Sequence, residues 1–289
     1  MSQNYYAVVG APIAHSLSPI IHQTFAKQFQ QALIYKKLFI SPTNFTKILP
    51  QLFSAGLQGA NITAPFKLLA YEFAEECTSR AQLAQSVNTL YFNEQGKLCG
   101  DTTDGAGLIF DIVHHHKQQI NDKNIMILGS GGTTRSLLPA LLTEKPRAIF
   151  LAHHDEKNAR GLVERLSTSS ITVLPLKAFA DYSCDILINT IPTIEWVNTI
   201  DFSSSLNLEN TWCYDICYGN LAADFKAFAE QYGARKVING IGMLIAQAAE
   251  SFYIWHGVRP AINFTFPLVG EIDRALARAG KGGDLSTKR

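Results

Sequence analysis

The chain contains 289 residues, of which 47% are hydrophobic and 17% are charged. This composition supplies enough apolar side chains for packed cores and excludes a disordered chain, and the length favours two domains. The 25 Lys and Arg residues almost balance the 24 Asp and Glu residues, so the chain lacks the basic surplus that is typical of nucleic-acid-binding proteins.

No segment of the sequence predicts export or membrane insertion. The first residues lack the basic and long apolar regions of a signal peptide. The most apolar helical stretch, Ile241–Trp255, is interrupted by Gln247 and Glu250 and is shorter than the ~20 residues that cross a bilayer. The five cysteines form no CxxC pair. We therefore expect a cytoplasmic protein with reduced thiols and no membrane partner.

Short β-rich runs alternate with longer helical stretches, which is typical of an α/β fold with parallel sheets. In the first third we predict strands at Tyr5–Gly10, Leu33–Ile40, Gly59–Ile62 and Val87–Phe92, and helices at Pro19–Gln30, Asn44–Ala55 and Arg80–Gln85. Ser18 precedes Pro19, a pair that suits the start of a helix with a capping hydroxyl.

A second unit begins near Asp104. Its predicted elements are a helix at Asp104–His115, a strand at Ile125–Leu128, a helix at Thr134–Leu142, a strand at Ala148–Ala152 and a helix at Glu156–Leu166. Strands at Cys184–Asn189 and Thr211–Ile216 follow, and helices at Gly240–His256 and Phe266–Ala279 close the chain. Short connections between strand and helix indicate a βαβ unit.

A glycine-rich turn joins the first strand of this second unit to its helix. It contains Gly129, Ser130, Gly131, Gly132 and Thr133. Such a turn can bring backbone N–H groups and the positive end of a helix dipole against a pyrophosphate. Thr134 occupies the position of the third fingerprint glycine, so a tight structural turn without a ligand is the alternative. The strand–turn–helix–strand order favours dinucleotide binding.

The end of the second strand in such a fold contacts the adenosine ribose of the dinucleotide. Here the residues are His153, His154 and Asp155. Two imidazoles could partly neutralise a 2′-phosphate, whereas the Asp155 carboxylate could accept a hydrogen bond from a free ribose hydroxyl. This segment alone leaves both NADP and NAD open.

Six dispersed segments together resemble the shikimate dehydrogenase family. They follow the family's order and approximate spacing and span almost the whole chain: Gly10–Pro19 (GAPIAHSLSP), Gly59–Lys67 (GANITAPFK), Ser86–Thr89 (SVNT), Gly100–Gly105 (GDTTDG), Tyr214–Tyr218 (YDICY) and Gly240–Ala249 (GIGMLIAQAA). Six motifs in one order are far more specific than any one of them.

The resemblance implies an N-terminal α/β substrate-binding domain, formed by residues 1–103 with 240–289, and a Rossmann domain for NADP, formed by residues 104–239. It places the active site in the cleft between the domains. The implied activity is the reversible, NADPH-dependent reduction of 3-dehydroshikimate to shikimate, in chorismate and aromatic amino-acid biosynthesis. The resemblance implies no metal and no nucleic-acid partner, and it allows a homodimer.

The resemblance also implies roles for individual residues. Lys67 and Asp104 would be catalytic. The substrate-binding set would be Ser16, Ser18, Asn61, Thr63, Lys67, Asn88, Asp104, Tyr218 and Gln247. Gly129, Ser130, Gly131, Gly132 and Thr133 would face the pyrophosphate, His153, His154 and Asp155 would lie at the ribose, and Ile216 and Gly240 would lie near the nicotinamide.

Four positions depart from the family pattern. They are Thr102, Thr133, Asn239 and the segment His153–Asp155, which lacks the Arg expected at the 2′-phosphate. All four lie in linker or cofactor-side segments, so the cofactor preference is open while the substrate positions are intact. Arg135 and Lys157 could replace the missing Arg, and we therefore favour NADP over NAD.

The chemistry of alcohol oxidation explains why the site would need these polar residues. Loss of a hydride from carbon must be accompanied by loss of the hydroxyl proton, and Lys67 could transfer that proton beside Asp104. Ser16 and Ser18, two residues apart, would face one side of an extended segment and suit a carboxylate. The alternatives are a surface lysine after a turn for Lys67, a helix cap for Ser18 and a core amide for Gln247.

Two other interpretations compete with the leading one. An NAD-preferring quinate/shikimate dehydrogenase is favoured by Asp155 and the missing Arg, and a non-catalytic dinucleotide sensor would keep the fold without turnover. The run His114–His116 could suggest a metal site. Because adjacent positions on an α-helix point in different directions, we expect a solvated helix end there instead.

Overall fold

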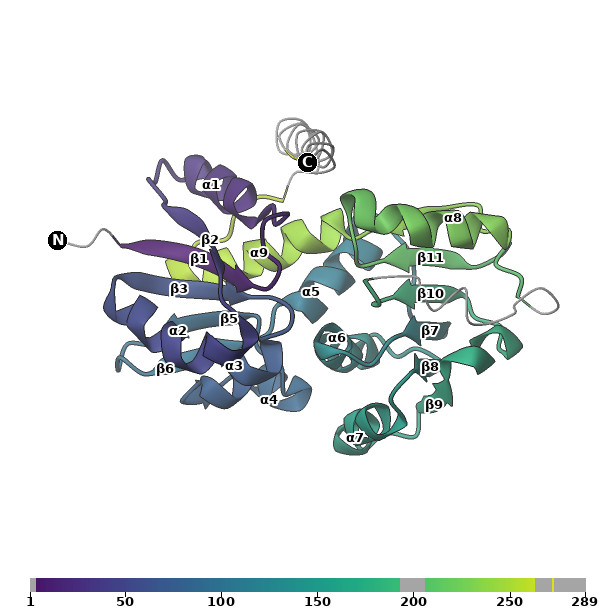
Figure 1. The fold of residues 1–289 in the computed structure, drawn as a ribbon. Coiled ribbons are helices and arrows are strands. Elements are labelled where there is room, and N and C mark those ends of the chain that lie inside the picture. Colours follow the sequence, from purple (N-terminus) through teal and green to yellow (C-terminus); the bar gives the residue numbers. More distant parts are fainter. Residues whose placement is uncertain (1–3, 193–205, 263–271, 273–289) are drawn as a thin grey trace, which may run out of the picture. The chain divides into compact units, whose positions relative to one another are not determined.

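The computed structural model describes residues 4–192, 206–262 and 272 (Figure 1). They fall into two compact units, one drawn from Met1–Gly107 and Leu244–Arg289 and the other from Leu108–Met243. The predicted helix Phe266–Ala279 lies outside the described residues except for Ile272. Among the described helices, none is both long enough and apolar enough to cross a membrane.

The first unit contains a six-stranded mixed sheet in the order β2-β1-β3-β5-β6-β4. Its strands are β1 (Tyr5–Gly10), β2 (Tyr35–Phe39), β3 (Leu57–Ile62), β4 (Glu76–Cys77), β5 (Thr89–Phe92) and β6 (Leu98–Asp101). Strand β1 pairs in parallel with β2 and β3, but β5 is antiparallel to both of its neighbours. The sheet is therefore parallel as expected except at β5, which a tight turn at Gly96 joins to β6 as a hairpin.

Helices cover both faces of this sheet. They are α1 (Ser18–Gln28), α2 (Phe45–Ser54), α3 (Lys67–Phe73) and α4 (Ser79–Ala84), with a 3₁₀ turn at η1 (Pro42–Asn44). Alternate residues of β1 face opposite sides: Val9 packs with Phe45 in the core under α2 and α3 (Figure 1), whereas Val8 packs with Tyr35 and Trp255 on the other face. The period of two in side-chain direction thus builds two cores from one strand.

The second unit contains an all-parallel sheet in the order β12-β11-β10-β7-β8-β9, whose labels β11 to β9 can be followed in sequence in Figure 1. Its strands are β7 (Asn124–Leu128), β8 (Ala148–His153), β9 (Ile171–Pro175), β10 (Ile186–Asn189), β11 (Trp212–Asp215) and β12 (Val237–Asn239). Numbered from β7, this order is the 3-2-1-4-5-6 arrangement of the dinucleotide-binding fold, with its switch point between β7 and β10. Ligands of such sheets bind beyond the carboxyl ends of the strands at that point.

The helices of the second unit lie on both faces of its sheet. They are α6 (Gly132–Thr143), α7 (Glu156–Leu166) and α8 (Ala223–Gln231), with 3₁₀ turns at η3 (Leu176–Asp181) and η5 (Gly219–Ala222). Ile127 packs with Leu137 of α6 in one core, and Leu128 packs with Phe225 of α8 in the other. Two helices, α5 (Asp104–Ile109) and α9 (Ile241–His256), carry the chain between the units.

Several predicted elements are confirmed, and three details are wrong. The strand Tyr5–Gly10 and the helix Glu156–Leu166 have the predicted bounds. Helix α1 begins at Ser18 itself and no side chain caps it, so the capping interpretation of Ser18 is wrong. Strand β3 ends at Ile62 as predicted, but a helix was missed after it: the Phe66 amide donates to the Thr63 carbonyl at 3.0 Å, and Lys67 opens α3.

The third correction concerns the predicted helix Asp104–His115. It is α-helical only to Ile109 and continues as a π-helical turn, η2 (Phe110–His115), in which the His116 amide donates to the Asp111 carbonyl at 2.9 Å. A π turn contains one more residue than an α turn. His115 and His116 therefore both lie beside Asp111, and the expectation that adjacent histidines diverge is wrong here.

Candidate active site

A buried ion pair joins the first residues of two helices in the first unit. Lys67, at the start of α3, places Nζ 2.6 Å from Oδ2 of Asp104, at the start of α5. The exposed fractions of the two side chains are 11% and 7%. A lysine at a helix start is opposed by the positive end of the dipole, whereas an aspartate is favoured there. The Asp104 carboxylate thus compensates the charge of a lysine that its own helix does not stabilise.

Asn88 holds the other oxygen of this carboxylate. Its Nδ2 donates to Oδ1 of Asp104 at 2.8 Å and lies 3.3 Å from Oε1 of Gln247 on α9. Its Oδ1 accepts from the Thr103 amide at 2.8 Å. Both oxygens of Asp104 therefore have fixed donors, which orients the carboxylate and the ammonium paired with it.

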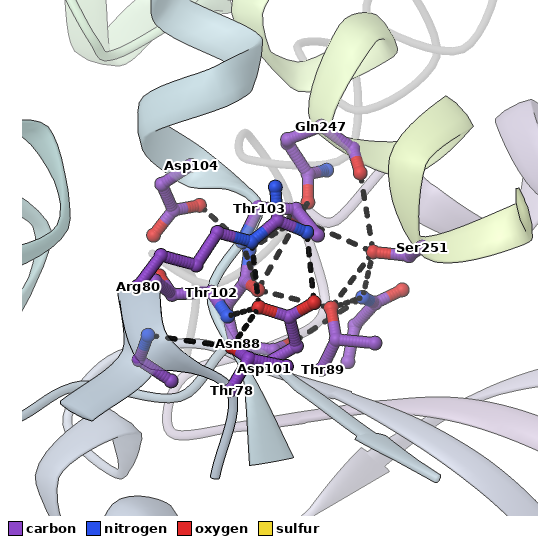
Figure 2. Close-up of polar contacts among 12 residues, drawn as sticks. Thr78, Arg80, Asn88, Thr89, Asp101, Thr102, Thr103, Asp104, Gln247 and Ser251 are labelled. Atoms are coloured by element: carbon purple, nitrogen blue, oxygen red, sulfur yellow. Dashed lines mark hydrogen bonds and ion pairs between the residues drawn. The ribbon is translucent and has the colours of Figure 1, made fainter. Parts of the chain in front are cut away.

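The polar cluster continues from Asn88 toward α9, and Figure 2 shows Thr103, Thr89, Gln247 and Ser251 meeting around it. Asn61 belongs to the same cluster, since its Nδ2 donates to Oγ of Ser251 at 2.9 Å. Its Oδ1 accepts from the Tyr35 hydroxyl at 2.7 Å. Burial raises the pKa of Tyr35 well above 10, so the phenol stays protonated and remains a donor.

Ser16 and Ser18 form a separate pair of buried hydroxyls where β1 leads into α1. Oγ of Ser16 donates to Oγ of Ser18 at 3.2 Å and accepts from the Ser18 amide at 3.3 Å. Because the two hydroxyls point toward each other, one anionic oxygen could accept from both. Thr63 is half-buried in the turn between β3 and α3.

A second acid in the same motif has a structural role. Asp101 accepts from Nε and Nη2 of Arg80 at 2.7 and 2.8 Å and from the Thr78 hydroxyl at 2.6 Å (Figure 2). It also accepts from the Thr102 amide at 2.7 Å. This bidentate pair fixes the backbone just before Asp104, and the Thr102 amide adds a further bond to the same carboxylate.

In the second unit, the glycine turn lies after β7 at the switch point of the sheet. Gly129 has a φ of +102°, and a Cβ there would lie 2.6 Å from Oγ1 of Thr190. Thr134 donates to the Gly129 carbonyl at 2.8 Å and also contacts Thr190. The hydroxyl of Thr134 therefore closes the turn at the position where the fingerprint has its third glycine.

Gly131 differs from Gly129, because a Cβ at Gly131 would meet nothing within 4 Å. It is the N-cap of α6, so open space lies where backbone amides and a helix dipole face outward. Asn158 of α7 fixes the backbone at Ser130, since the Ser130 carbonyl accepts from Nδ2 of Asn158 at 2.7 Å. Nη2 of Arg135 donates to Oδ1 of Asn158 at 2.5 Å. A permanent positive charge is thereby placed beside the turn.

The three residues predicted at the ribose have different environments. His153 is buried, and this burial lowers the pKa of its imidazole, which leaves the ring neutral at pH 7. His154 and Asp155 are exposed. Oδ1 of Asp155 accepts from the Asn158 amide at 3.0 Å and caps α7. One oxygen of Asp155 is thus engaged by its own helix.

Ile216 and Gly240 lie against each other in the second unit. A Cβ at Gly240 would lie 2.1 Å from the Ile216 carbonyl oxygen, so this contact requires glycine. Asn239 caps α9 through the Ile241 amide at 3.1 Å. Asp215, beside Ile216, accepts from the Cys217 amide, and burial raises its pKa to about 6. Tyr218, the last predicted substrate residue, precedes η5 in this same unit.

The structure therefore brings Asn61, Lys67, Asn88, Asp104 and Gln247 into one cluster, with Ser16 and Ser18 as a pair in the same unit. Sequence reasoning missed Thr89, Thr103 and Ser251 in that cluster and Asn158 behind the glycine turn. Ser251 lies four residues after Gln247, a spacing that puts both on one helix face. For Asn158 there was no local signal, because it approaches Ser130 from the next βα unit.

Comparisons with known proteins agree with this architecture. The family described as "Shikimate dehydrogenase substrate binding domain" matches residues 8–90, and the "Shikimate 5'-dehydrogenase C-terminal domain" matches residues 240–263. The chain is 39% identical over 94% of its length to the shikimate dehydrogenase (NADP(+)) of Hydrogenovibrio crunogenus, covering 98% of that protein. It is 42% identical over 90% of its length to that of Herminiimonas arsenicoxydans, covering 95% of it. The crystal structure of an Ael1 enzyme from Pseudomonas putida superposes with a TM-score of 0.80, at 33% identity, and the match covers 94% and 98% of the two chains.

Proposed function

This chain belongs to the shikimate dehydrogenase family, and we propose that it catalyses the reversible, NADP-dependent reduction of 3-dehydroshikimate to shikimate. The observation that carries the proposal is the buried Lys67–Asp104 pair, oriented by Asn88 inside the segment matched by the substrate-binding domain. An ammonium held this way is a positioned proton donor. It meets the need of a carbonyl that becomes an alcohol.

The proton transfer follows from the geometry of the pair. The bound nicotinamide supplies or accepts the hydride. In the direction of reduction, Nζ of Lys67 gives a proton to the oxygen that was the carbonyl, and Asp104 stabilises the ammonium before the transfer. In the direction of oxidation, the neutral amine takes that proton back. Asn88 fixes Asp104 and thereby the direction of Nζ.

The substrate has one carboxylate and three hydroxyls, so it needs several fixed polar partners. We assign the carboxylate to Ser16 and Ser18, whose hydroxyls already converge. Asn61, Thr63, Asn88 and Gln247 supply amide and hydroxyl groups for the substrate hydroxyls, and Tyr218 adds a phenol. In this reading the hydroxyl that reacts lies at Lys67 and Asp104.

The glycine turn has the features that a dinucleotide needs. Open space at Gly131, the N-terminus of α6 and the switch point of the parallel sheet all occur together. Gly129, Ser130, Gly131, Gly132 and Thr133 would hold the pyrophosphate, with Ile216 and Gly240 near the nicotinamide. These residues fit NADP, which the names of the curated relatives also include.

We infer that Arg135 binds the 2′-phosphate in place of the arginine that the segment His153–Asp155 lacks. The buried His153 is neutral at pH 7 and attracts a phosphate weakly. The guanidinium of Arg135 stays charged at every physiological pH and is held by Asn158 beside the turn. The segment His153–Asp155 is the observation that favours the second candidate, an NAD-preferring quinate/shikimate dehydrogenase, but capping of α7 already engages Asp155.

We also propose where in the cell this activity occurs and which biosynthesis it serves. An enzyme of this activity would work in the cytoplasm, in the synthesis of chorismate and the aromatic amino acids. A homodimer is compatible with the proposal.

The test is a steady-state assay of the purified protein with shikimate or quinate, each with NADP⁺ or NAD⁺. We expect kcat/KM to be highest with shikimate and NADP⁺.

Arg135→Gln should raise KM for NADP⁺ by roughly 10- to 100-fold, the value of a charge-assisted contact of ~1.5–3 kcal/mol, with little change for NAD⁺. Lys157→Gln is the matched control. The NADP⁺ preference of the wild type should not fall between about pH 6 and about pH 8.5, because Arg does not titrate there and the 2′-phosphate, with a second pKa of about 6, only gains negative charge. A preference that falls as pH rises would assign the phosphate to the histidines, and a highest kcat/KM with quinate and NAD⁺ would support the second candidate.

A further inference from the structure

A histidine–carboxylate cluster lies in the second unit, and none of its three residues has a role assigned above. Asp111, His115 and His116 each offer one ligand atom, and these atoms all lie within 4.8 Å of one another. Nδ1 of His115 is 2.7 Å from Oδ1 of Asp111, and Nε2 of His116 is 3.6 Å from the same oxygen. The reaction derived above uses none of the three.

The π-helical turn η2 creates this arrangement. Its backbone bond from the His116 amide to the Asp111 carbonyl brings residues four and five positions after Asp111 over the same carboxylate. In a continuous α-helix the residues three and four positions after Asp111, His114 and His115, would lie there, and His116 would not. Single π turns are rare and occur frequently at functional sites. The π-helical turn therefore brings two imidazoles to the carboxylate of Asp111.

Asp111 is held as metal-binding carboxylates are. Its side chain is fully buried, and Oδ2 accepts from the Tyr214 hydroxyl at 2.5 Å, so Oδ1 is left for the two histidines. Burial of a carboxylate is unfavourable unless a cation balances it. Within the described ranges, the basic groups paired with this carboxylate are the two imidazoles, which carry a positive charge only when protonated, so a bound cation would balance the buried carboxylate. A second partner that fixes a ligating carboxylate is a regular feature of metal sites.

We propose that Asp111, His115 and His116 bind a divalent transition-metal ion of the Zn²⁺ type. Bonds of ~2.0–2.2 Å at tetrahedral angles separate neighbouring ligand atoms by roughly 3.3 Å, a value between the two nitrogen–oxygen spacings of 2.7 and 3.6 Å found here. Two imidazoles and one carboxylate suit Zn²⁺, Ni²⁺ or Co²⁺ rather than Mg²⁺ or Ca²⁺. The two imidazoles are 33% and 19% exposed, so an ion can enter and a water can complete the coordination.

The chain offers a matched control and a local reporter. His114 is the neighbouring histidine, but it is exposed, its ring contacts Phe110 and it does not belong to the cluster. The Trp212 ring lies 5.9 Å from the His116 ring. A paramagnetic Ni²⁺ ion bound at the cluster should therefore quench the fluorescence of Trp212. Variants of the histidines keep all five cysteines, so thiol binding of metal is the same in each.

The experiment is calorimetric titration of metal-free protein with Zn²⁺, with Ni²⁺ quenching as the second measurement. We expect one ion per chain at this site, a loss of affinity of at least about 100-fold in His115→Ala and His116→Ala, and no loss in His114→Ala, since even outer partners of a metal site cost 10–100-fold. Saturating Zn²⁺ should raise the Tm of the wild type and of His114→Ala only. Equal Zn²⁺ affinity in all four proteins, or quenching that persists in His116→Ala, would overturn the proposal. Those results would leave a histidine–aspartate ion pair as the role of the cluster.

Discussion

The paired hydroxyls of Ser16 and Ser18 show how single residues carry specificity. Each is buried, and the N-cap residue of α1, Leu17, gives the helix no side-chain cap, whereas Oγ of Ser16 accepts from the Ser18 amide. Ser16→Ala and Ser18→Ala should each raise KM for shikimate by roughly 10- to 100-fold, since a hydrogen bond to a charged group is worth ~1.5–3 kcal/mol. KM for NADP⁺ should stay within a few-fold. Initial-rate kinetics of both single variants and the double variant test this, and an unchanged KM for shikimate in the double variant would remove the serines from the site.

His22 is a buried titratable residue outside the reaction. Its ring stacks on Tyr35 with centroids 4.5 Å apart, and burial lowers its pKa from 6.5 to about 3. The unfolded chain therefore binds a proton below pH 6.5 that the folded chain does not. Stability is complete above pH 6.5 and is lost as pH falls toward 3, by up to ~1.4 kcal/mol per pH unit.

Replacement of His22 by an aromatic residue of similar shape tests this linkage. At pH 5 the wild type should have lost about 2 kcal/mol of unfolding free energy through His22 alone, and His22→Phe should not show that loss. Urea denaturation at several pH values, followed through the nearby Trp255, measures the difference. The exposed His154→Gln is the control. If wild type and His22→Phe lose stability in parallel between pH 7 and pH 5, the buried imidazole is not the cause.

At the scale of elements, the glycine turn separates a structural glycine from a functional one. Gly129→Ala should destabilise the fold by about 1–3 kcal/mol, because a left-handed φ is strained for alanine and the methyl group would meet Thr190. Gly131→Ala meets no atom, so its unfolding free energy should change by less than ~1 kcal/mol. Its KM for NADP⁺ should nevertheless rise at least several-fold, since the methyl group occupies the approach of the pyrophosphate. Thermal denaturation and cofactor titration of both variants decide the matter, and Gly131→Ala with a normal KM would place the pyrophosphate elsewhere.

The elements that the sequence predicted well are those with a strong period. The strand Tyr5–Gly10 and the helix Glu156–Leu166 have the predicted bounds, and the structure adds that Asp155, predicted only at the ribose, caps that helix. Helix α3 was not predicted because it is short, with seven residues, and because only four residues, including Pro65, separate it from the end of β3. The π turn at Phe110–His115 could not be predicted, since its backbone pattern has no counterpart in the hydrophobic period.

At the scale of the whole molecule, the sequence predicted which residues form the candidate site better than it predicted the short elements of the fold. Lys67, Asn88, Asp104 and Gln247 come from four separate segments, and a resemblance across the chain was needed to place them together. Their partners Thr103 and Ser251 are chosen by tertiary contact, which spacing along the chain does not reveal. On the cofactor side, the contact that holds Arg135 was not predicted, because its partner Asn158 lies in the next helix, α7.

The central claim is that Lys67, oriented by Asp104, transfers the proton of the reaction. The most direct measurement compares kcat and shikimate binding in Lys67→Ala with Lys97→Ala, an exposed lysine that also pairs with an acid. Because Lys67→Ala leaves Asp104 without its ion-pair partner, a folded protein must first be verified by circular dichroism. The account predicts that Lys67→Ala lowers kcat by about 10²–10⁴-fold and leaves the Kd for shikimate within a few-fold, while Lys97→Ala changes neither. A folded Lys67→Ala enzyme that turns over at the wild-type rate would contradict it.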